Sequence, residues 1–266
     1  MMRRLRLTGV CIVAALVLSA IVVASAAAEA PEYGRCEKAP KVGKKYTGKY
    51  DNAACTPPKT ELEKKAVEKG EGKFEWHAGV VKVKQMSKGG KGILEEAGKY
   101  AVGCESETSS GEYSGPKQVK HLIVKFKKCE APGLVCTSEG HEKGELETRS
   151  LEGRVVWENE KLHKTALDLF PEGGGGFIEF NCGGTLTVAV RGSILVPVAA
   201  DKMSTTVTLK YVGKKGVQKL QDYEEGGVKI KDVLEANFAG AGFVQASQSI
   251  TSTVTNEEKL ELNAYE

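Results

Sequence analysis

Short segments in which apolar and polar residues alternate, separated by clusters of glycine, constrain the fold of this chain more than any other feature. In segment 205–211, Val207, Leu209 and Tyr211 share one face, and threonine and lysine occupy the other. Half-buried strands joined by glycine turns are typical of sandwiches and barrels. We therefore predict an all-β protein, a single antiparallel sandwich or barrel of roughly a dozen short strands.

Other segments extend this pattern along most of the chain. In segment 73–83 the apolar residues change phase near Gly79, which predicts a bulge or a bend between sheets. The remaining strand candidates are 92–104, 119–127, 145–157, 164–170, 177–182, 185–190, 193–198, 228–234, 249–255 and 259–264.

One stretch, near residues 60–69, indicates a helix. Thr60 and Glu63 have the spacing of a capping box, and two prolines precede them. The stretch has few apolar residues to bury, so we predict one short surface helix, with a linker as the alternative. A second short helix is possible around 230–236, where the alternation is not clean.

The N-terminus has the order of a cleaved signal peptide. Arg3, Arg4 and Arg6 precede an apolar run over 10–23, and small residues follow at 24–28. An uncleaved membrane anchor would need about 20 apolar residues, and this run is shorter. We predict cleavage after Ala26, with Ala28 as the alternative. The mature protein is then secreted or at the cell surface, without stable membrane insertion.

The predicted cleavage divides the chain into three parts and removes its excess of positive charge. The parts are a signal peptide over 1–26, a disulfide-containing N-terminal segment with the helix over 27–70, and the main β domain over 71–266. The full chain has 38 basic and 35 acidic side chains, and the leader contains three arginines and no acid. The mature chain is therefore neutral, which argues against a nucleic-acid partner.

An even number of cysteines remains after the leader, and in an exported protein this predicts disulfides. Cys129 and Cys136 flank a Pro-Gly turn, so we expect them to pair across a hairpin. Local closure favours Cys36 with Cys55, which leaves Cys104 with Cys182, although sequence alone does not decide the pairing. No Cys-x-x-Cys occurs and the histidines are scattered, so we predict no metal and no cofactor.

Motifs for catalysis are weak, and we nominate no catalytic residue. The glycine run 173–176 lacks the lysine of a phosphate loop, and no Gly-x-Ser-x-Gly surrounds any serine, Ser114 and Ser193 included. The four histidines have ordinary surroundings in the sequence: His77, His121, His141 and His163.

Three further side chains have both a functional and a structural interpretation. Asp168 lies among apolar residues, but the alternation places it opposite Leu167 and Leu169, which predicts a solvent-facing position rather than a catalytic one. Trp76 and Trp157 could stack on a sugar or a peptide, yet packing in the sheet is the commoner role of tryptophan in β proteins.

The region from Cys104 to Leu262 resembles a group of uncharacterised secreted bacterial β-rich proteins. The resemblance lies in turn and cysteine motifs, namely 111–117, Cys129 with 136–138, 151–153, 190–193 and 255–258. It implies export and a shared β fold, and it implies no activity, ligand or catalytic residue.

Three functions are compatible with these observations. The preferred one is a non-enzymatic extracellular or cell-envelope protein, a binding or structural module whose partner is an envelope glycan or protein. The alternative is a secreted hydrolase of polysaccharide or peptidoglycan, which requires two acids about 5 to 10 Å apart in a cleft beside an exposed tryptophan. The third is a carrier of a small apolar ligand, which requires a closed barrel with a dry interior of about 300 Å³ or more.

Overall fold

The computed structural model describes residues 31–80, 82–97 and 100–265. The predicted signal peptide over 1–26 lies outside these residues. The chain is nearly all β, with 62% of it in strands and 3% in helix. This confirms the all-β class, and of the two predicted architectures the structure is a closed antiparallel barrel.

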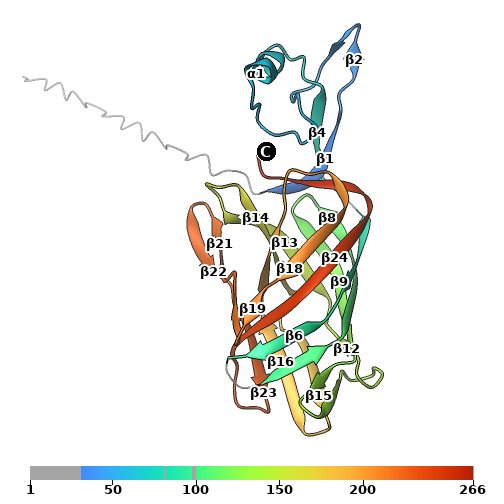
Figure 1. Ribbon diagram of the computed structural model, residues 1–266, viewed down its shortest axis with the longest axis vertical. Helices are drawn as coiled ribbons and strands as arrows, with labels where there is room; N and C mark the ends of the chain where they lie inside the picture. The colour runs from blue at the N-terminus through green and yellow to red at the C-terminus, as the bar shows by residue number, and fades with distance from the viewer. Residues whose placement is uncertain (1–30, 81, 98–99, 266) are drawn as a thin grey trace, which may run out of the picture.

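Eight strands surround the half of the barrel near the C-terminus (Figure 1). Neighbouring strands form antiparallel ladders, and the consecutive strands β17 and β18 lie side by side. In order around the barrel they are β5 (Val83–Gly89), β8 (Ser106–Gly115), β9 (Gln118–Lys127), β13 (Leu151–Asn159), β14 (Lys164–Pro171), β17 (Ile194–Val198), β18 (Ser204–Tyr211) and β24 (Val244–Asn263).

A second circle of antiparallel pairings closes the other half of the barrel. The 20-residue strand β24 belongs to both halves, since it pairs with β6 at 246–249 and with β5 at 252–256. The other strands of this half are β6 (Gly92–Glu96), β7 (Ala101–Cys104), β10 (Glu130–Ala131), β11 (Leu134–Thr137), β15 (Gly176–Cys182), β16 (Leu186–Gly192) and β23 (Leu234–Phe238).

The barrel is therefore tall, and most of its long strands are broken once along their length. At the break between β16 and β17, Gly192, the last residue of β16, has a φ of +95°, a conformation that residues other than glycine rarely adopt. Together with the short strands of the N-terminal extension and of two hairpins, these breaks explain why the described chain contains 24 strand segments and not the predicted dozen.

An N-terminal extension lies over one end of the barrel (Figure 1). It contains β1 (Glu32–Lys38), β2 (Lys41–Val42), β3 (Lys45–Tyr46), α1 (Glu61–Glu68) and β4 (Phe74–Ala78). β1 pairs with β4 on one side and with the end of β24 on the other, so the extension continues the barrel sheet. Gly79, with a φ of +93°, makes the predicted bend between β4 and β5.

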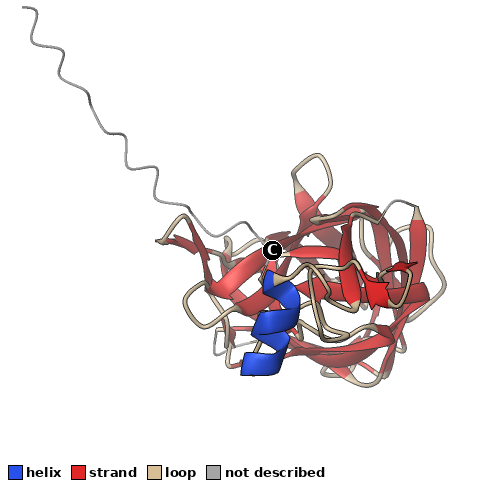
Figure 2. Ribbon diagram, turned by 90° about the horizontal axis from the view of Figure 1, so that it is seen from above, coloured by secondary structure: helices blue, strands red, loops and turns tan. Residues whose placement is uncertain are grey.

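The helix α1 confirms the capping prediction, and it is the single helix in the described residues (Figure 2). Thr60 accepts from the backbone N–H of Glu63, whose carboxylate accepts from the backbone N–H of Thr60. None of its residues is buried, so it is a surface helix.

The second helix expected around 230–236 is wrong. The segment is divided between β22 (Val228–Lys231), which forms a hairpin with β21 (Asp222–Glu225), and β23, which pairs with β16. In β23, Leu234, Ala236 and Phe238 are buried and alternate with partly exposed residues. Burial of one face with a period of two favours a strand over a helix here. Three short segments complete the described strands: β12 (Leu146–Glu147), β19 (Gly213–Lys214) and β20 (Val217–Gln218).

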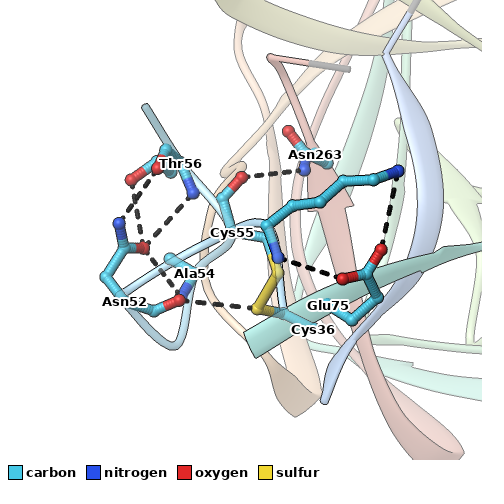
Figure 3. Close-up of a disulfide and its surroundings, with 8 residues drawn as sticks. Cys36, Asn52, Ala54, Cys55, Thr56, Glu75 and Asn263 are labelled. Carbon is cyan, nitrogen blue, oxygen red and sulfur yellow. Dashed lines mark hydrogen bonds and ion pairs between the residues drawn. A yellow bond between two sulfur atoms is a disulfide. The ribbon is translucent and has the colours of Figure 1, made fainter. Parts of the chain in front are cut away.

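Three disulfides connect the six cysteines, and one of them has the predicted pairing. Cys36 is bonded to Cys55 with a Cα–Cα distance of 5.6 Å. Figure 3 shows that Asn52 holds the adjacent loop by accepting from the backbone N–H groups of Ala54 and Thr56. Asn263, at the end of β24, donates to the carbonyl oxygen of Cys55 at 3.4 Å, so the extension is fastened to the barrel beside this disulfide.

The other two disulfides correct the predicted pairing, because Cys104 is bonded to Cys129 and Cys136 to Cys182. The expected hairpin does form, and the backbone N–H of Cys136 donates to the carbonyl of Cys129 at 2.8 Å. Cys129 and Cys136 nevertheless do not bond to each other. Each is bonded to a cysteine of the strand that lies on the outer side of the hairpin, β7 for Cys129 and β15 for Cys136. Cys136 lies opposite Cys182 in the ladder between β11 and β15, at a Cα–Cα distance of 3.9 Å. The sequence cannot predict this, because the outer neighbours of a hairpin are set by the barrel.

The disulfides fit a protein that matures in an oxidising, extracellular environment. The single helix in residues 31–80, 82–97 and 100–265 has eight residues, and no helix there has the length and the apolar composition of a membrane span.

Candidate functional site

The interior of the barrel contains a cavity of about 160 Å³. Side chains from both halves of the barrel contribute to its wall, and most of them are apolar. They include Leu94, Val102, Leu122, Phe126, Leu169 and Phe180. The alternation of each strand creates this lining, because every second side chain points inward.

Polar residues interrupt the apolar lining at one place. In β5 the inward-facing residues are Val83, Gln85 and Ser87, and in β24 Ser252 lies between the inward-facing Ile250 and Val254. Because β24 pairs with β5 and β5 with β8, these polar positions meet Glu107 of β8 on adjacent strands.

Glu107 is the centre of this polar cluster, and its side chain is buried. Ser87 Oγ donates to its Oε1 at 2.6 Å, and Ser252 Oγ donates to its Oε2 at 2.7 Å. Ser87 Oγ is also 2.7 Å from Ser109 Oγ. Because Ser87 donates its proton to the carboxylate, its oxygen is left to accept from Ser109. Two hydroxyls thus donate directly to the carboxylate, and the third, that of Ser109, donates to Ser87.

Gly89 leaves the space that this carboxylate occupies. A Cβ at position 89 would lie 2.6 Å from Glu107 Oε2 and 2.7 Å from Ser252 Oγ, closer than real contacts allow. The φ of Gly89 is not in the left-handed region, so the requirement for glycine here is spatial. The cluster therefore depends on a missing side chain as well as on the polar ones.

Tyr211 also faces the cavity. Burial and, to a smaller extent, the nearby charge of Glu107 raise the pKa of Tyr211. Its phenol therefore stays protonated at neutral pH and is available as a hydrogen-bond donor.

A second buried acidic cluster lies outside the barrel wall and contains the candidate Asp168. Asp168 and Asp232 are in hydrogen-bonding contact, Arg154 Nε donates to Asp168 Oδ2 at 2.9 Å, and Ser193 Oγ donates to Asp232. Burial is the largest cause that raises the pKa of Asp232 to about 7, and the negative charge of Asp168 is the next largest. The pair therefore holds a proton that two isolated aspartates would release.

The predicted solvent-facing position of Asp168 is wrong, since its side chain is 2% exposed. Alternation placed it correctly on the face opposite Leu167 and Leu169, which is the outer face of the barrel. That face is covered by a small apolar cluster that includes Tyr223 of β21. Sequence pattern predicts the face of a strand, but it does not predict which hairpin packs over that face.

A second, smaller hollow of about 30 Å³ contains another buried acid. Glu261 is 1% exposed, and neither of its carboxyl oxygens has a hydrogen-bond partner among the described residues. Burial, with a smaller contribution from Asp201, raises the pKa of Glu261 to about 7. A hollow of this size has room for one or two water molecules and not for a larger ligand.

Both tryptophans have structural surroundings. Trp157 is buried, and its ring meets His163 edge to face at 5.9 Å. Trp76 is half-buried in β4, and its Nε1 donates to Glu32 Oε1 at 3.0 Å. Neither tryptophan lines the barrel cavity or the smaller hollow.

The histidines are dispersed over the molecule. His121 is exposed and pairs with Glu112 at 3.2 Å, and His141 lies 3.9 Å from Glu147. His163 stacks on Tyr265, and His77 is exposed on β4. Within the described ranges, no group of three or more His, Cys, Asp or Glu side chains is placed to hold a metal ion.

The remaining motif candidates lie in turns or beside the acidic cluster. Gly173, Gly174 and Gly175 have positive φ values between β14 and β15, as in the loop that the sequence predicts. Ser114 is near the end of β8, and Ser193 lies between β16 and β17, where it donates to Asp232.

No protein-family model, curated protein or solved structure matches this chain. The resemblance to secreted bacterial β-rich proteins therefore stays a prediction, and the function has to be argued from the geometry of the barrel.

The sequence does not predict the Glu107 cluster, because β8 is read there as a gap between strands. Its segment 106–112 is polar throughout and lacks apolar alternation. A signal was present in β24, where Ser252 is in phase with Ile250 and Val254, and in β5, where Gln85 and Ser87 are in phase with Val83. Polar residues on the inward phase of two strands indicate a polar site inside the barrel.

Proposed function

We propose that this protein is an exported binding barrel that holds a small, mainly apolar molecule in its interior. The barrel cavity supports this proposal most directly, because its wall is apolar over most of its area and carries one polar cluster. Such a combination is common in ligand pockets, where apolar walls supply affinity and a few polar groups fix orientation. The three disulfides are consistent with action outside the cell.

The cavity volume limits the size of the ligand. At about 160 Å³ it is smaller than the interior of roughly 300 Å³ expected for a carrier. An engineered protein cavity of about 150 Å³ lined by Leu, Ile and Phe binds benzene. The ligand proposed here therefore has the size of a single substituted ring or a short branched chain.

The hydrolase alternative receives no support from these two hollows. Glu107 is the one carboxylate in the wall of the cavity, and Glu261 is the one carboxylate in the wall of the smaller hollow, among the residues that the structure describes. Asp168 and Asp232 touch each other under a hairpin, so no substrate fits between them. An envelope glycan or protein partner remains a prediction.

Toluene titration of the mature, oxidised protein tests the proposal. We expect saturable shifts in the methyl NMR signals of cavity residues such as Leu122, with weak affinity because the ligand has few atoms. Val102→Phe, which fills part of the cavity, should weaken the binding at least tenfold. Val228→Phe makes the same change on an exposed strand and should leave it unaltered. Equal binding by both variants, or no saturable shift in the wild type, contradicts the proposal.

A further inference from the structure

The polar cluster in the cavity contains a carboxylate, that of Glu107, and no basic side chain among the described residues. Glu107 is the one ionisable side chain in the wall apart from Tyr211, and within the described chain no lysine, arginine or histidine lines the cavity. Buried carboxylates in proteins are usually paired with a cation, because a charge removed from water is costly when it is unpaired. The missing partner is a positive charge.

Two serine hydroxyls donate to the Glu107 carboxylate and leave part of its acceptor capacity free. A carboxylate has about four lone-pair positions, and the hydroxyl groups of Ser87 and Ser252 occupy two of them. Ser109, behind Ser87, extends the row of donors. The protonated phenol of Tyr211 is near, and its raised pKa reflects in part the charge of Glu107.

We infer that the ligand of this cavity is a small organic cation, an apolar group carrying a primary ammonium that pairs with Glu107. This inference rests on the proposed binding function and specifies its ligand class. The ammonium would donate to the free positions of the carboxylate, and the apolar group would lie among the leucine, valine and phenylalanine side chains. A neutral ligand leaves the carboxylate without a counter-charge, and an anionic one repels it.

The space around the carboxylate determines what kind of cation fits. Gly89 leaves room for the carboxylate at the wall, and a Cβ at Gly92 would lie 3.0 Å from Ile250 and 3.2 Å from the Gln248 amide. With a cavity of about 160 Å³, a primary ammonium on a CH₂ group fits beside an apolar ring better than a bulky quaternary ammonium does. The test ligands are therefore benzylamine and three molecules of nearly the same shape, namely benzyl alcohol, toluene and benzoate.

Isothermal titration of the full mature protein with these four compounds at pH 7 tests the inference. We expect benzylamine to bind at least tenfold more tightly than benzyl alcohol or toluene, and benzoate to bind least. Glu107→Gln keeps the shape of the side chain and removes its charge, so it should abolish the preference for the amine. Toluene should bind this variant about as well as the wild type, which also shows that the cavity is intact. Glu112→Gln removes an outward-facing charge from the same strand and should retain the preference for the amine.

The outcomes distinguish a failure of this inference alone from a failure of the proposed function. If toluene and benzyl alcohol bind but benzylamine is not preferred, or if Glu107→Gln keeps the preference, the cation assignment is overturned and the binding function stands. If benzoate binds most tightly, the assignment is also overturned. If none of the four binds to the wild type, the proposed function fails, and this inference fails with it.

Discussion

At the scale of single residues, Asp168 and Asp232 lie side by side beneath the β21–β22 hairpin and share the guanidinium of Arg154. One cation cannot neutralise two buried carboxylates, so the pair retains a proton. The proton stabilises the folded state at low pH, because the unfolded chain releases it near pH 4. As the pH rises from about 4 toward 7, the folded protein binds more protons than the unfolded one, and the free energy of unfolding falls.

Replacing Asp232 with asparagine should therefore flatten this part of the pH profile. The amide resembles the protonated acid, and it still accepts from Ser193 and donates to Asp168. We expect Asp232→Asn to be more stable than the wild type at pH 8 by about 2 to 4 kcal/mol, with little difference at pH 4. Urea unfolding at the two pH values measures this. Asp222→Asn, on the exposed part of the same hairpin, is the control; an equal gain at both pH values for Asp232→Asn would contradict the shared proton.

The sequence predicts contacts between residues that are close in the chain, and it misses contacts between distant residues. Thr60 and Glu63 are predictable because a capping box involves neighbours three residues apart. The covering of Asp168 by Tyr223 and the contact of Glu107 with Ser252 join residues far apart in the chain, and alternation within one strand does not encode them. The inward phase of Ser252 is encoded, so part of the site could have been found.

Among the strands, a glycine at a break lets the chain change direction and continue from one half of the barrel into the other. Gly192 is the clearest case, because a Cβ there would lie 2.1 Å from the carbonyl oxygen of Val233. The backbone oxygen cannot move away without disturbing β23, which pairs with β16. The close approach and the positive φ both require glycine.

Gly192→Ala should destabilise the protein by about 2 to 4 kcal/mol, through the clash and the strained φ together. Gly174 also has a positive φ, but a Cβ at that position would meet nothing within 4 Å. Gly174→Ala is therefore the matched control, with an expected cost of about 1 kcal/mol from the backbone alone. Thermal unfolding measures both; equal costs would mean that the close approach to Val233 is not rigid.

The strands themselves are the best-predicted level of this structure. Segment 205–211 lies within β18, and 164–170 lies within β14, because a buried face imposes a period of two on the sequence. The polar strand β8 is missed because two of its inward residues, Glu107 and Ser109, are themselves polar. The 230–236 segment is misread as helix because two short strands meet within it.

At the scale of the whole molecule, the order of strands around the barrel decides properties that no local pattern shows. β24 follows the height of the barrel, and its neighbours come from both ends of the chain (Figure 1). Cys136 meets Cys182 because β11 and β15 are neighbours in the same circle. The sequence leaves sandwich and barrel open for the same reason, since closure depends on pairings between distant strands.

Xenon binding tests the central claim, a closed barrel around an apolar cavity, most directly. Xenon occupies apolar protein cavities of about 150 Å³ without needing a polar partner. Diffraction from crystals of the mature protein under xenon pressure should show a site inside the barrel, among Leu122, Phe126 and Leu169. Val102→Phe should reduce the occupancy of that site. An interior filled with side chains and without xenon, or strands that form two separate sheets, would contradict a closed barrel around an apolar cavity.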